Sequence, residues 1–452
     1  MPGRDEPRSA RRSVARSRIV GVTAIVATLL GTPSAIAAPP QSPEEVGGEL
    51  RPAKDRFDDA RRVADALLFV PRALVEVVVM MSSATVSFLE DQQVVPRARA
   101  LMRSEDGRIR ATPTLSIVSG LRPEVGARLT AVEGPLASMV RASVVDRDAY
   151  LSETRVVLSL GEKQLYVEAF EQRSDGLAFV GVGPVPRDDR RNAFAPGHEG
   201  ATATFAELRE RVIAGVSARF QEDTELLLSG SFQHRAVTDP RVASPDTLAT
   251  TFLPGSVPGA YARSDRFYVE SALRRDTRAV RGPPAAGLLV EVYGGASEDA
   301  RGLFSPALHA GGTFSLFVPV VRSTTIINPR VSLEIIDPLG DKGLPFRELS
   351  HAAGFRGVDA RVDRVAALAS VDYRWQLIPF VAARLFVDTT TVAPGFFSLG
   401  VDHLAWAVGG GIDLHSRTTE LGRLGVSYSP QAVQLILTFG LAGPGFGDRQ
   451  HR

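Results

Sequence analysis

The chain has 452 residues, with 52 Lys and Arg residues against 51 Asp and Glu residues, so its net charge is +1. This balance gives no overall positive field that would attract nucleic acid, and 23% charged residues is too many for a bundle of membrane-spanning helices. The absence of cysteine excludes a disulfide scaffold, cysteine zinc ligands and thiol catalysis. The composition leaves two fold classes open, a large soluble β-rich protein and an outer-membrane β-barrel.

The N-terminal region has the pattern of an export signal. Six arginines lie within residues 1–18, an apolar stretch runs from Ile19 to Leu30, and Ala35-Ile36-Ala37 follows. A basic region, a short apolar core and an Ala-x-Ala site are typical of a secretory signal peptide. The apolar core is also shorter than the roughly 20 residues that a membrane span needs. We therefore expect residues 1–37 to be a signal peptide that is cleaved after Ala37, with the mature chain outside the cytoplasm.

Two further segments precede the region that we predict to be β-structured. Residues 38–57 are rich in Pro, Gly and charged residues and are predicted to be a linker, whereas residues 58–102 are predicted to be a helical segment. A helix with one apolar stripe must bury it, either against the rest of the protein or at a membrane interface. The stretch Leu74–Met81 is also compatible with a strand because of its β-branched residues. The apolar residues at helical spacing are Val63, Ala66, Leu67, Val70, Leu74, Val77 and Val78.

From about Arg103 onward the hydrophobic period changes to two, which predicts β-strands. In the segments 365–375, 381–388 and 404–414 one face is apolar, and the other face carries Arg, Asp, Gly and Ser. The last such segment has Val433, Leu435, Leu437 and Phe439 on one face, and we predict that it is the strand that closes the sheet.

This alternation is typical of a barrel with lipid outside and a polar lumen inside. Aromatic residues such as Tyr373, Trp375 and Phe439 lie near strand ends, where an aromatic girdle would lie. A closed barrel is also the one β architecture that leaves no unpaired backbone in hydrocarbon. A soluble β-sandwich or propeller is the alternative, although no repeat of 20–50 residues supports a propeller. We therefore predict an all-β, transmembrane antiparallel barrel over residues 103–440.

Three short motifs follow one another within the predicted barrel. The first is Asp276-Thr277-Arg278, with Gly287-Leu288-Leu289 after a Pro-containing turn. The second is Leu344-Pro345-Phe346, followed by Gly354-Phe355-Arg356-Gly357-Val358. The third is Asp372-Tyr373-Arg374-Trp375, followed by Phe386-Val387-Asp388.

In order and spacing these motifs resemble those of the bacterial surface antigen superfamily of outer-membrane β-barrels, the BamA- and TamA-like barrel domains. The resemblance covers about residues 100–440 and implies a sixteen-stranded barrel whose sixth extracellular loop folds back into the lumen. It further implies that Asp276, Arg278 and Gly287 form a strand-turn motif. Assembly factors and two-partner-secretion transporters belong to this superfamily, so the resemblance implies a role in inserting or translocating proteins or lipids.

The chemistry of the predicted sixth loop centres on one carboxylate. Asp388 lies on the polar face of its segment, and a carboxylate in a narrow lumen is costly unless it is paired. Arginine can meet a carboxylate with two parallel charge-assisted bonds, and the resemblance implies that Arg356 is the partner. Gly357 would let the loop backbone approach the wall closely. We call Arg356, Gly357, Phe386 and Asp388 the latch. The alternative is that Arg356 is an ordinary surface-loop arginine.

The chain also departs from the pattern of the superfamily. Val358 stands in place of an aromatic residue, and Thr390 stands where the last motif has glycine. Insertases and transporters of the superfamily carry periplasmic POTRA modules, and we find no such module in residues 38–102. We therefore expect a barrel-only member in which the helical segment 58–102 is a periplasmic cap or plug, and in which residues 441–452 form a tail.

No enzyme signature is present, and no cofactor or metal is expected. The sequence has no Gly-x-Ser-x-Gly elbow, His-Glu-x-x-His pair or phosphate loop. The seven histidines are scattered, with no pair at metal-ligand spacing. A site assembled from distant strands could still use His309 with Ser305, or His403 with Asp402.

Two functions follow from the predicted barrel. The first is insertion or translocation at the outer membrane, with outer-membrane lipids as surroundings and with unfolded outer-membrane proteins, a secreted protein, a lipid cargo or a periplasmic partner as partners. In that case the seam between the first and last strands opens sideways. The second is a passive pore or a structural membrane protein with no assembly role. No nucleic acid is expected as a partner.

Overall fold

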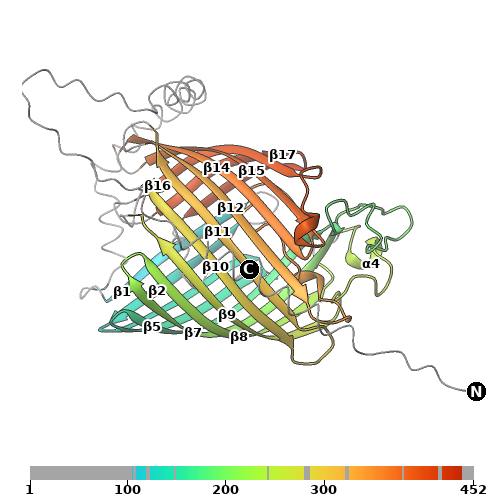
Figure 1. Cartoon of the computed structure of the whole chain (residues 1–452), viewed down its shortest axis with the longest axis horizontal. Coiled ribbons are helices and arrows are strands. Elements are labelled where there is room, and N and C mark those ends of the chain that lie inside the picture. Colours follow the sequence, from blue (N-terminus) through green and yellow to red (C-terminus); the bar gives the residue numbers. More distant parts are fainter. Residues whose placement is uncertain are drawn as a thin grey trace, which may run out of the picture. The chain divides into compact units, whose positions relative to one another are not determined.

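Sixteen antiparallel strands close into one barrel in the part of the chain that the structure describes (Figure 1). The structure is a computed structural model that describes residues 104, 108–118, 123–146, 149–241, 244–278, 286–320, 325–378, 381–415 and 420–439. The predicted fold class and strand number are thus confirmed. The barrel strands are β1 (Ile109–Val118), β2 (Glu124–Glu133), β3 (Leu136–Asp146), β4 (Ala149–Leu160), β5 (Lys163–Phe179), β7 (Ala203–Gln221), β8 (Thr224–Thr238), β9 (Arg263–Asp276), β10 (Gly287–Asp299), β11 (Ala307–Pro319), β12 (Thr325–Pro338), β14 (Val365–Ile378), β15 (Val381–Ala393), β16 (Ala405–His415), β17 (Glu420–Ser429) and β18 (Ala432–Phe439).

The predicted signal peptide (1–37), linker (38–57), helical segment (58–102) and tail (441–452) lie outside the described residues. Among the described residues, no helix is long and apolar enough to cross a membrane. The remaining elements are short and lie in loops. They are β6 (Gly181–Val182), α4 (Leu248–Thr251), η1 (Phe346–Glu348), β13 (Arg361–Val362) and η2 (Phe396–Ser398).

The wall of the barrel is apolar outside and polar inside. Outward residues such as Val125, Val269 and Val331 are more than half exposed, whereas Asp388 and Asp413 on the inner face are fully buried. This distribution is the reverse of that in a soluble protein and suits a wall between lipid and a polar lumen. It follows from the period-two pattern of the sequence, since successive side chains of a strand point to opposite faces of the sheet.

The two ends of the barrel differ. At one end short turns join the strands, for example Gly134-Pro135 between β2 and β3 and Glu222-Asp223 between β7 and β8. We call this the short-turn end. We call the other end the long-loop end and number its connections L1 to L8 in chain order. The longer ones are L3 (180–202), L4 (239–262), L6 (339–364) and L7 (394–404). Figure 1 shows α4 and its neighbouring loops gathered at this end.

An apolar cap lies at the long-loop end. L3, L4 and L6 meet there around Phe346, whose ring centre lies 4.6 Å from that of Phe179 and 5.2 Å from that of Phe205. A two-residue parallel pairing of β6 with β13 adds a backbone connection between L3 and L6. The buried cluster comprises Phe179, Ala203, Phe205, Val237, Leu248, Phe252, Val257, Phe346 and Val362. L6 is thus fixed to the neighbouring loops before and after it enters the lumen.

Candidate functional site: the lumen loop and the strand seam

L6 spans the lumen and contacts the wall on two sides. On one side Arg347 Nη2 lies 2.9 Å from Glu207 Oε2 of β7, and Arg266 Nη1 of β9 lies 2.8 Å from Glu348 Oε2. On the other side the loop reaches β14, β15 and β17 through Arg356. Because the contacts on each side are buried ion pairs, L6 occupies a defined position inside the barrel.

The structure brings Arg356 and Asp388 together. Arg356 donates to Asp388 Oδ2 from its backbone N at 3.0 Å and from Nε at 2.8 Å, and its Nη2 donates to Oδ1 at 2.5 Å. Its guanidinium also lies 3.7 Å from the ring centre of Phe386. The Asp388 side chain has no exposed surface, and that of Arg356 is 14% exposed. A two-point pair of this kind, buried and stacked on an aromatic ring, is strongly oriented.

Three residues of this site were not predicted from the sequence. Asp372 Oδ1 accepts from Arg356 Nη1 at 2.5 Å, and Ser370 Oγ accepts from Arg356 Nη2 at 2.8 Å. Ser427 of β17 donates to the Arg356 carbonyl at 2.5 Å. A signal was present, because Ser370 and Asp372 alternate onto the same polar face and Ser370 lies directly opposite Asp388 in the register.

Gly357 lies where the loop touches the wall. A Cβ at this position would meet Ala407 Cβ at 2.9 Å and the ring of Phe355 at 2.7 Å. Only glycine therefore fits without displacement of the wall or of Phe355. The two residues that depart from the superfamily motif, Val358 and Thr390, both form hydrogen bonds with the wall. Val358 N donates to Ser429 Oγ at 3.4 Å, and Thr390 Oγ1 donates to the Ala367 carbonyl at 2.9 Å.

A second ion cluster lies nearer the short-turn end. The Asp413 carboxylate, buried on β16, accepts from Arg384 Nε at 3.0 Å and from Arg423 Nε at 3.1 Å, and Arg374 lies 3.2 Å away. Arg384 therefore pairs with Asp413 and not with Asp388, although it stands only four positions from Asp388 in the sequence. The three arginines come from β14, β15 and β17, so the cluster ties four neighbouring strands together.

The strand-turn motif forms at the short-turn end. Asp276 accepts from Arg278 Nε at 2.8 Å and from Nη2 at 2.7 Å, and the Arg278 guanidinium lies 4.7 Å from the ring centre of Phe317. Gly287 begins β10 with φ +152°, and a Cβ there would lie 3.0 Å from Arg278 Cα. The three residues named from the sequence thus lie together around the connection from β9 to β10.

We expect Gly287→Ala to destabilise the barrel by about 1–3 kcal/mol, since this backbone region is essentially restricted to glycine. The measurement is the urea midpoint of the protein refolded into lipid vesicles. Gly294→Ala on the same strand is the control, because its nearest neighbour would be 3.9 Å from the new Cβ and its φ is not positive. Equal urea midpoints for the two variants would contradict the conclusion that the backbone at position 287 requires glycine.

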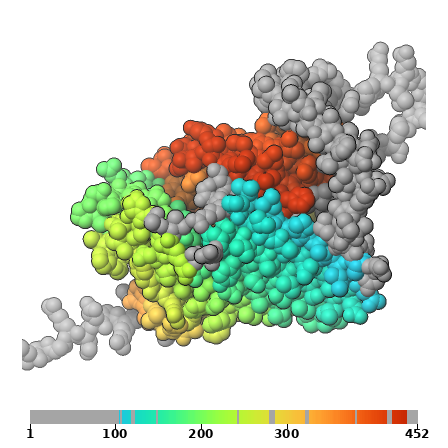
Figure 2. Space-filling view, turned by 180° about the vertical axis from the view of Figure 1, so that it is seen from behind, coloured from blue at the N-terminus to red at the C-terminus, as the bar shows by residue number. Residues whose placement is uncertain are grey.

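The barrel closes through an antiparallel pairing of β1 with β18. Among the described residues four pairs join them, from Leu115–Phe439 to Val118–Ile436, and the register would continue at both ends into residues 119–122 and 440 onward, which the structure does not describe. Figure 2 shows the cyan first strands beside the red last strands. On the edge of β1 that faces β18, no described residue pairs with Ile109–Thr114. Pro113 lies in that stretch and has no N–H to donate, as is usual for an edge strand. We call this closure the seam.

The predicted closing residues lie on this strand as expected from their alternation. Val433 is 59% exposed, Leu435 is 43% exposed and Phe439 is 44% exposed, and Leu437 faces the same way. β18 thus presents an apolar outer face beside the seam.

Two cavities lined by described residues lie in the lumen. One, of about 110 Å³, lies beside L6 and is lined by both arginines and glutamates, among them Arg211, Arg266, Glu270 and Glu334. The other, of about 600 Å³, lies at the short-turn end between the turns and the inner wall; we call it the vestibule. Its lining is polar, with residues Gly161, Glu162, Gln164, Ser217, Arg219, Gln221, Glu222 and Glu225.

Of the two histidines considered from the sequence, His309 has a side-chain partner other than the expected one. His309 Nε2 lies 2.8 Å from Ser297 Oγ, whereas the hydroxyl of Ser305 accepts from the backbone of Lys342 at 3.1 Å. For His403 the structure gives a contact of the backbone only, whose carbonyl accepts from Arg361 Nη1 at 2.9 Å, so the pair with Asp402 stays a prediction. Within the described part of the chain, no group of three or more His, Asp or Glu side chains could hold a metal ion.

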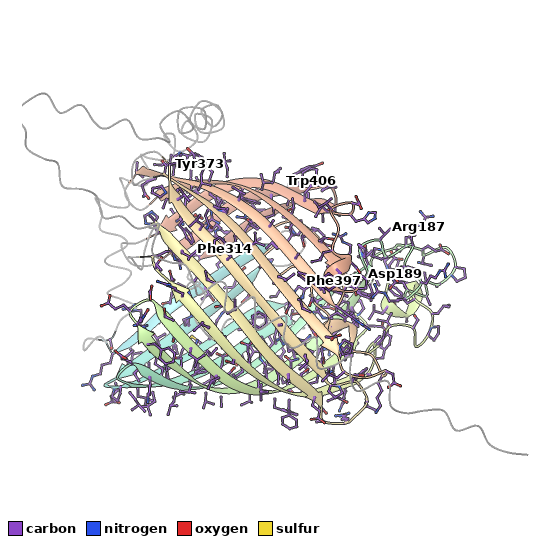
Figure 3. All side chains as sticks on the ribbon, in the orientation of Figure 1. Arg187, Asp189, Phe314, Tyr373, Phe397 and Trp406 are labelled. Carbon is purple, nitrogen blue, oxygen red and sulfur yellow. The ribbon has the colours of Figure 1, made fainter. Side chains whose placement is uncertain are left out.

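An ion pair between the loops at the long-loop end connects L3 to L6. Arg191 donates to both carboxylate oxygens of Asp363, at 2.8 and 2.7 Å, and to Asp189 as well. The hydrogen bonds from Arg191 hold the pKa of Asp189 below its ordinary value, despite partial burial. Figure 3 shows Asp189 in the loop cluster at the end of the barrel where Phe397 also lies.

Outward-pointing aromatic residues lie near both ends of the wall, and Phe439, near the short-turn end, is 44% exposed. At the long-loop end Trp406 and Tyr428 point outward, are 39% and 49% exposed, and have ring centres 5.8 Å apart. Tyr373 and Trp375 also point outward, near the short-turn end, yet they are only 6% and 1% exposed. Their outward direction agrees with the prediction, and their contact with lipid stays a prediction.

Comparison with known proteins supports the fold. No protein-family model matches the sequence, and no curated protein sequence matches it. Among solved structures, the chain is similar to BamA from Haemophilus ducreyi lacking POTRA domains 1–3, with a TM-score of 0.52 and 13% identity over 74% of this chain and 70% of that one. CdiB from Escherichia coli gives a TM-score of 0.47 and 12% identity over 73% of this chain and 62% of that one. The resemblance to the surface-antigen barrel is thus confirmed at the level of the fold.

Proposed function

We propose that this protein is an outer-membrane barrel that assists the insertion or translocation of proteins or lipids by opening at the seam. The observation that supports this most directly is that the ring closes between the first and the last strand of the barrel, β1 and β18. Every other pair of neighbouring barrel strands is also joined by a loop or turn of the chain, whereas β1 and β18 are held together by backbone pairing alone, so this pair can separate like two edge strands. The long-loop end would face outward and the short-turn end would face the periplasm, as in other outer-membrane barrels.

In this proposal the latch keeps L6 in the lumen while the seam opens and closes. L6 touches the wall at β7, β9, β14, β15 and β17, so it links strands on both sides of the barrel. The surroundings would be outer-membrane lipids. The cargo would be an unfolded outer-membrane protein, a secreted protein or a lipid, with a periplasmic partner that delivers it.

A passive pore is the second candidate, and the vestibule of about 600 Å³ at the short-turn end favours it. A pore predicts steady conductance in a planar bilayer and no effect on other membrane proteins. Opening at the seam predicts no steady conductance and a loss of other membrane components when the protein is deleted.

The test is quantitative proteomics of the outer-membrane fraction, with and without this protein. We expect the protein in that fraction and a loss of other barrels, or of a surface lipid, when it is deleted. Its absence from the fraction in the wild type would contradict the membrane location. An unchanged proteome and lipid composition would leave the pore as the supported function.

A further inference from the structure

The loop L7 carries apolar side chains that the protein leaves in contact with its surroundings. Phe397 is 99% exposed, Val401 is 77% exposed and Phe396 is 46% exposed. The loop has one acidic residue, Asp402, and no Lys or Arg. L7 is thus an apolar loop at the same end of the barrel where L3 carries the charged run of residues 187–191.

The two phenylalanines of L7 lie in a closed turn, η2. Ser398 N donates to the Gly395 carbonyl at 3.0 Å, and Leu399 N donates to the Phe396 carbonyl at 3.3 Å. The two rings contact each other edge to face, with their centres 5.4 Å apart. The backbone hydrogen bonds of the turn therefore fix both rings side by side on the surface.

Phenylalanines of the neighbouring loops have the opposite environment. Phe252 of L4 and Phe346 of L6 are buried in the apolar cap, and the Phe194 ring of L3 stacks on Phe252 with centres 4.9 Å apart. The long-loop end therefore has an apolar interior that takes up aromatic side chains, and Phe397 lies outside it. Because burial of a phenylalanine side chain contributes about 1.5–3 kcal/mol, an apolar medium around L7 would be strongly favourable.

L7 is continuous with the apolar outer face of β16. The loop returns to the wall at Leu404, which shares the outward face with Trp406 and Val408, and all three are more than one-third exposed. Trp406 and Tyr428 form the outward aromatic pair at this end, and such residues prefer the boundary between acyl chains and headgroups. At about 3.4 Å for each residue, Leu404 lies roughly 7 Å beyond Trp406 along the strand. This is within a headgroup layer of about 5–8 Å.

We propose that L7 inserts Phe396, Phe397 and Val401 into the outer leaflet of the surrounding membrane, beside β15 and β16. The membrane is the occupant that the observations favour, since the exposed apolar side chains continue a face of the wall that is directed at lipid. Figure 3 shows Phe397 at the same end of the barrel as Trp406. Inserted in this way, L7 anchors the long-loop ends of the two strands next to it at the membrane surface. The inference rests on the membrane location in the proposed function and is independent of opening at the seam.

A fluorescent label on a single cysteine tests the proposal, because the chain has no cysteine of its own. Ser398→Cys places the environment-sensitive NBD label beside the two rings and keeps both phenylalanines. The protein is refolded into phosphatidylcholine vesicles with iodide on both sides of the membrane or with nitroxide-labelled lipid. We expect a blue-shifted emission, strong quenching by lipid that carries the nitroxide near the headgroup, and little quenching by iodide.

Two reference positions calibrate the measurement. Val408→Cys on the outer wall reports contact with lipid, and Arg190→Cys in the charged run of L3 reports exposure to water. A label at position 408 that lipid does not quench would contradict the membrane location, and with it the proposed function. Lipid contact at position 408 together with iodide quenching at position 398 would contradict the insertion of L7 alone. Heat-modifiable migration on gels verifies that each variant has folded.

The contribution of the two phenylalanines is measured with the same label at position 398. Adding Phe396→Ser with Phe397→Ser should raise its iodide quenching to the level found at position 190. Leu253→Ser, which removes an exposed leucine of L4, is the matched control and should leave the label in lipid. A label that stays in lipid without both rings would overturn the proposal. Protection from iodide and from lipid together would also overturn it, because a second copy or another protein would then cover L7.

Discussion

Arg356→Ala should lower the stability of the barrel by about 3–5 kcal/mol, the cost of removing one partner of a buried ion pair. The loss is large because the Asp388 carboxylate has no exposed surface and would keep Ser370 as its remaining side-chain donor. Asp372 would lose the same partner. We expect a lower urea midpoint in lipid vesicles.

The same substitution should raise the conductance of the protein in a planar bilayer, since L6 would lose its contacts with β14 and β15. Arg356→Lys keeps the charge but not the two-point geometry, so its effects should be intermediate. Arg190→Ala, an exposed arginine of L3, is the control and should match the wild type. If Arg356→Ala also matches the wild type in both assays, Arg356 does not act as a latch.

A disulfide across the seam should abolish the proposed activity. Ser116 and Thr438 lie directly opposite each other on β1 and β18, and opposed residues of antiparallel strands are about 4.5–5.5 Å apart, within the span of a disulfide. The chain has no cysteine of its own, so Ser116→Cys with Thr438→Cys forms one defined link. If the barrel works by opening at the seam, the oxidised variant should fail to restore the outer-membrane composition of a deletion strain.

The control is Thr130→Cys with Met139→Cys, which lie opposite each other on β2 and β3. This link crosses a pairing of nine residues that need not open, and we expect it to restore the strain like the wild type. Full restoration by the seam link, with the disulfide verified by mass spectrometry, would show that sideways opening is not required.

The sequence predicted the barrel because alternation is a local property. Each strand shows which residues face lipid and which face the lumen without reference to any other strand, since side chains alternate along the backbone. Short motifs located L6, the residues Arg356 and Asp388, and the turn of Asp276, Arg278 and Gly287. Predicting these features required only residues close together in the sequence and the resemblance to the superfamily.

The partners of the charged residues could not be predicted in the same way. Arg384 is four residues from Asp388 in the sequence, yet it pairs with Asp413 across the sheet. Which inward side chains meet depends on the register of each strand with its neighbours, and one step of register changes every pair. The shared role of Asp372, Ser370 and Ser427 around Arg356 depends on this register too.

The sequence by itself therefore determined the fold class, the two faces of the wall and the loop that enters the lumen. Only the tertiary structure decided that Arg384 binds Asp413, and that Ser370 and Ser427 join Arg356 in the latch. The physical reason is that closing the ring fixes register and packing between residues hundreds of positions apart, and no local pattern contains that information.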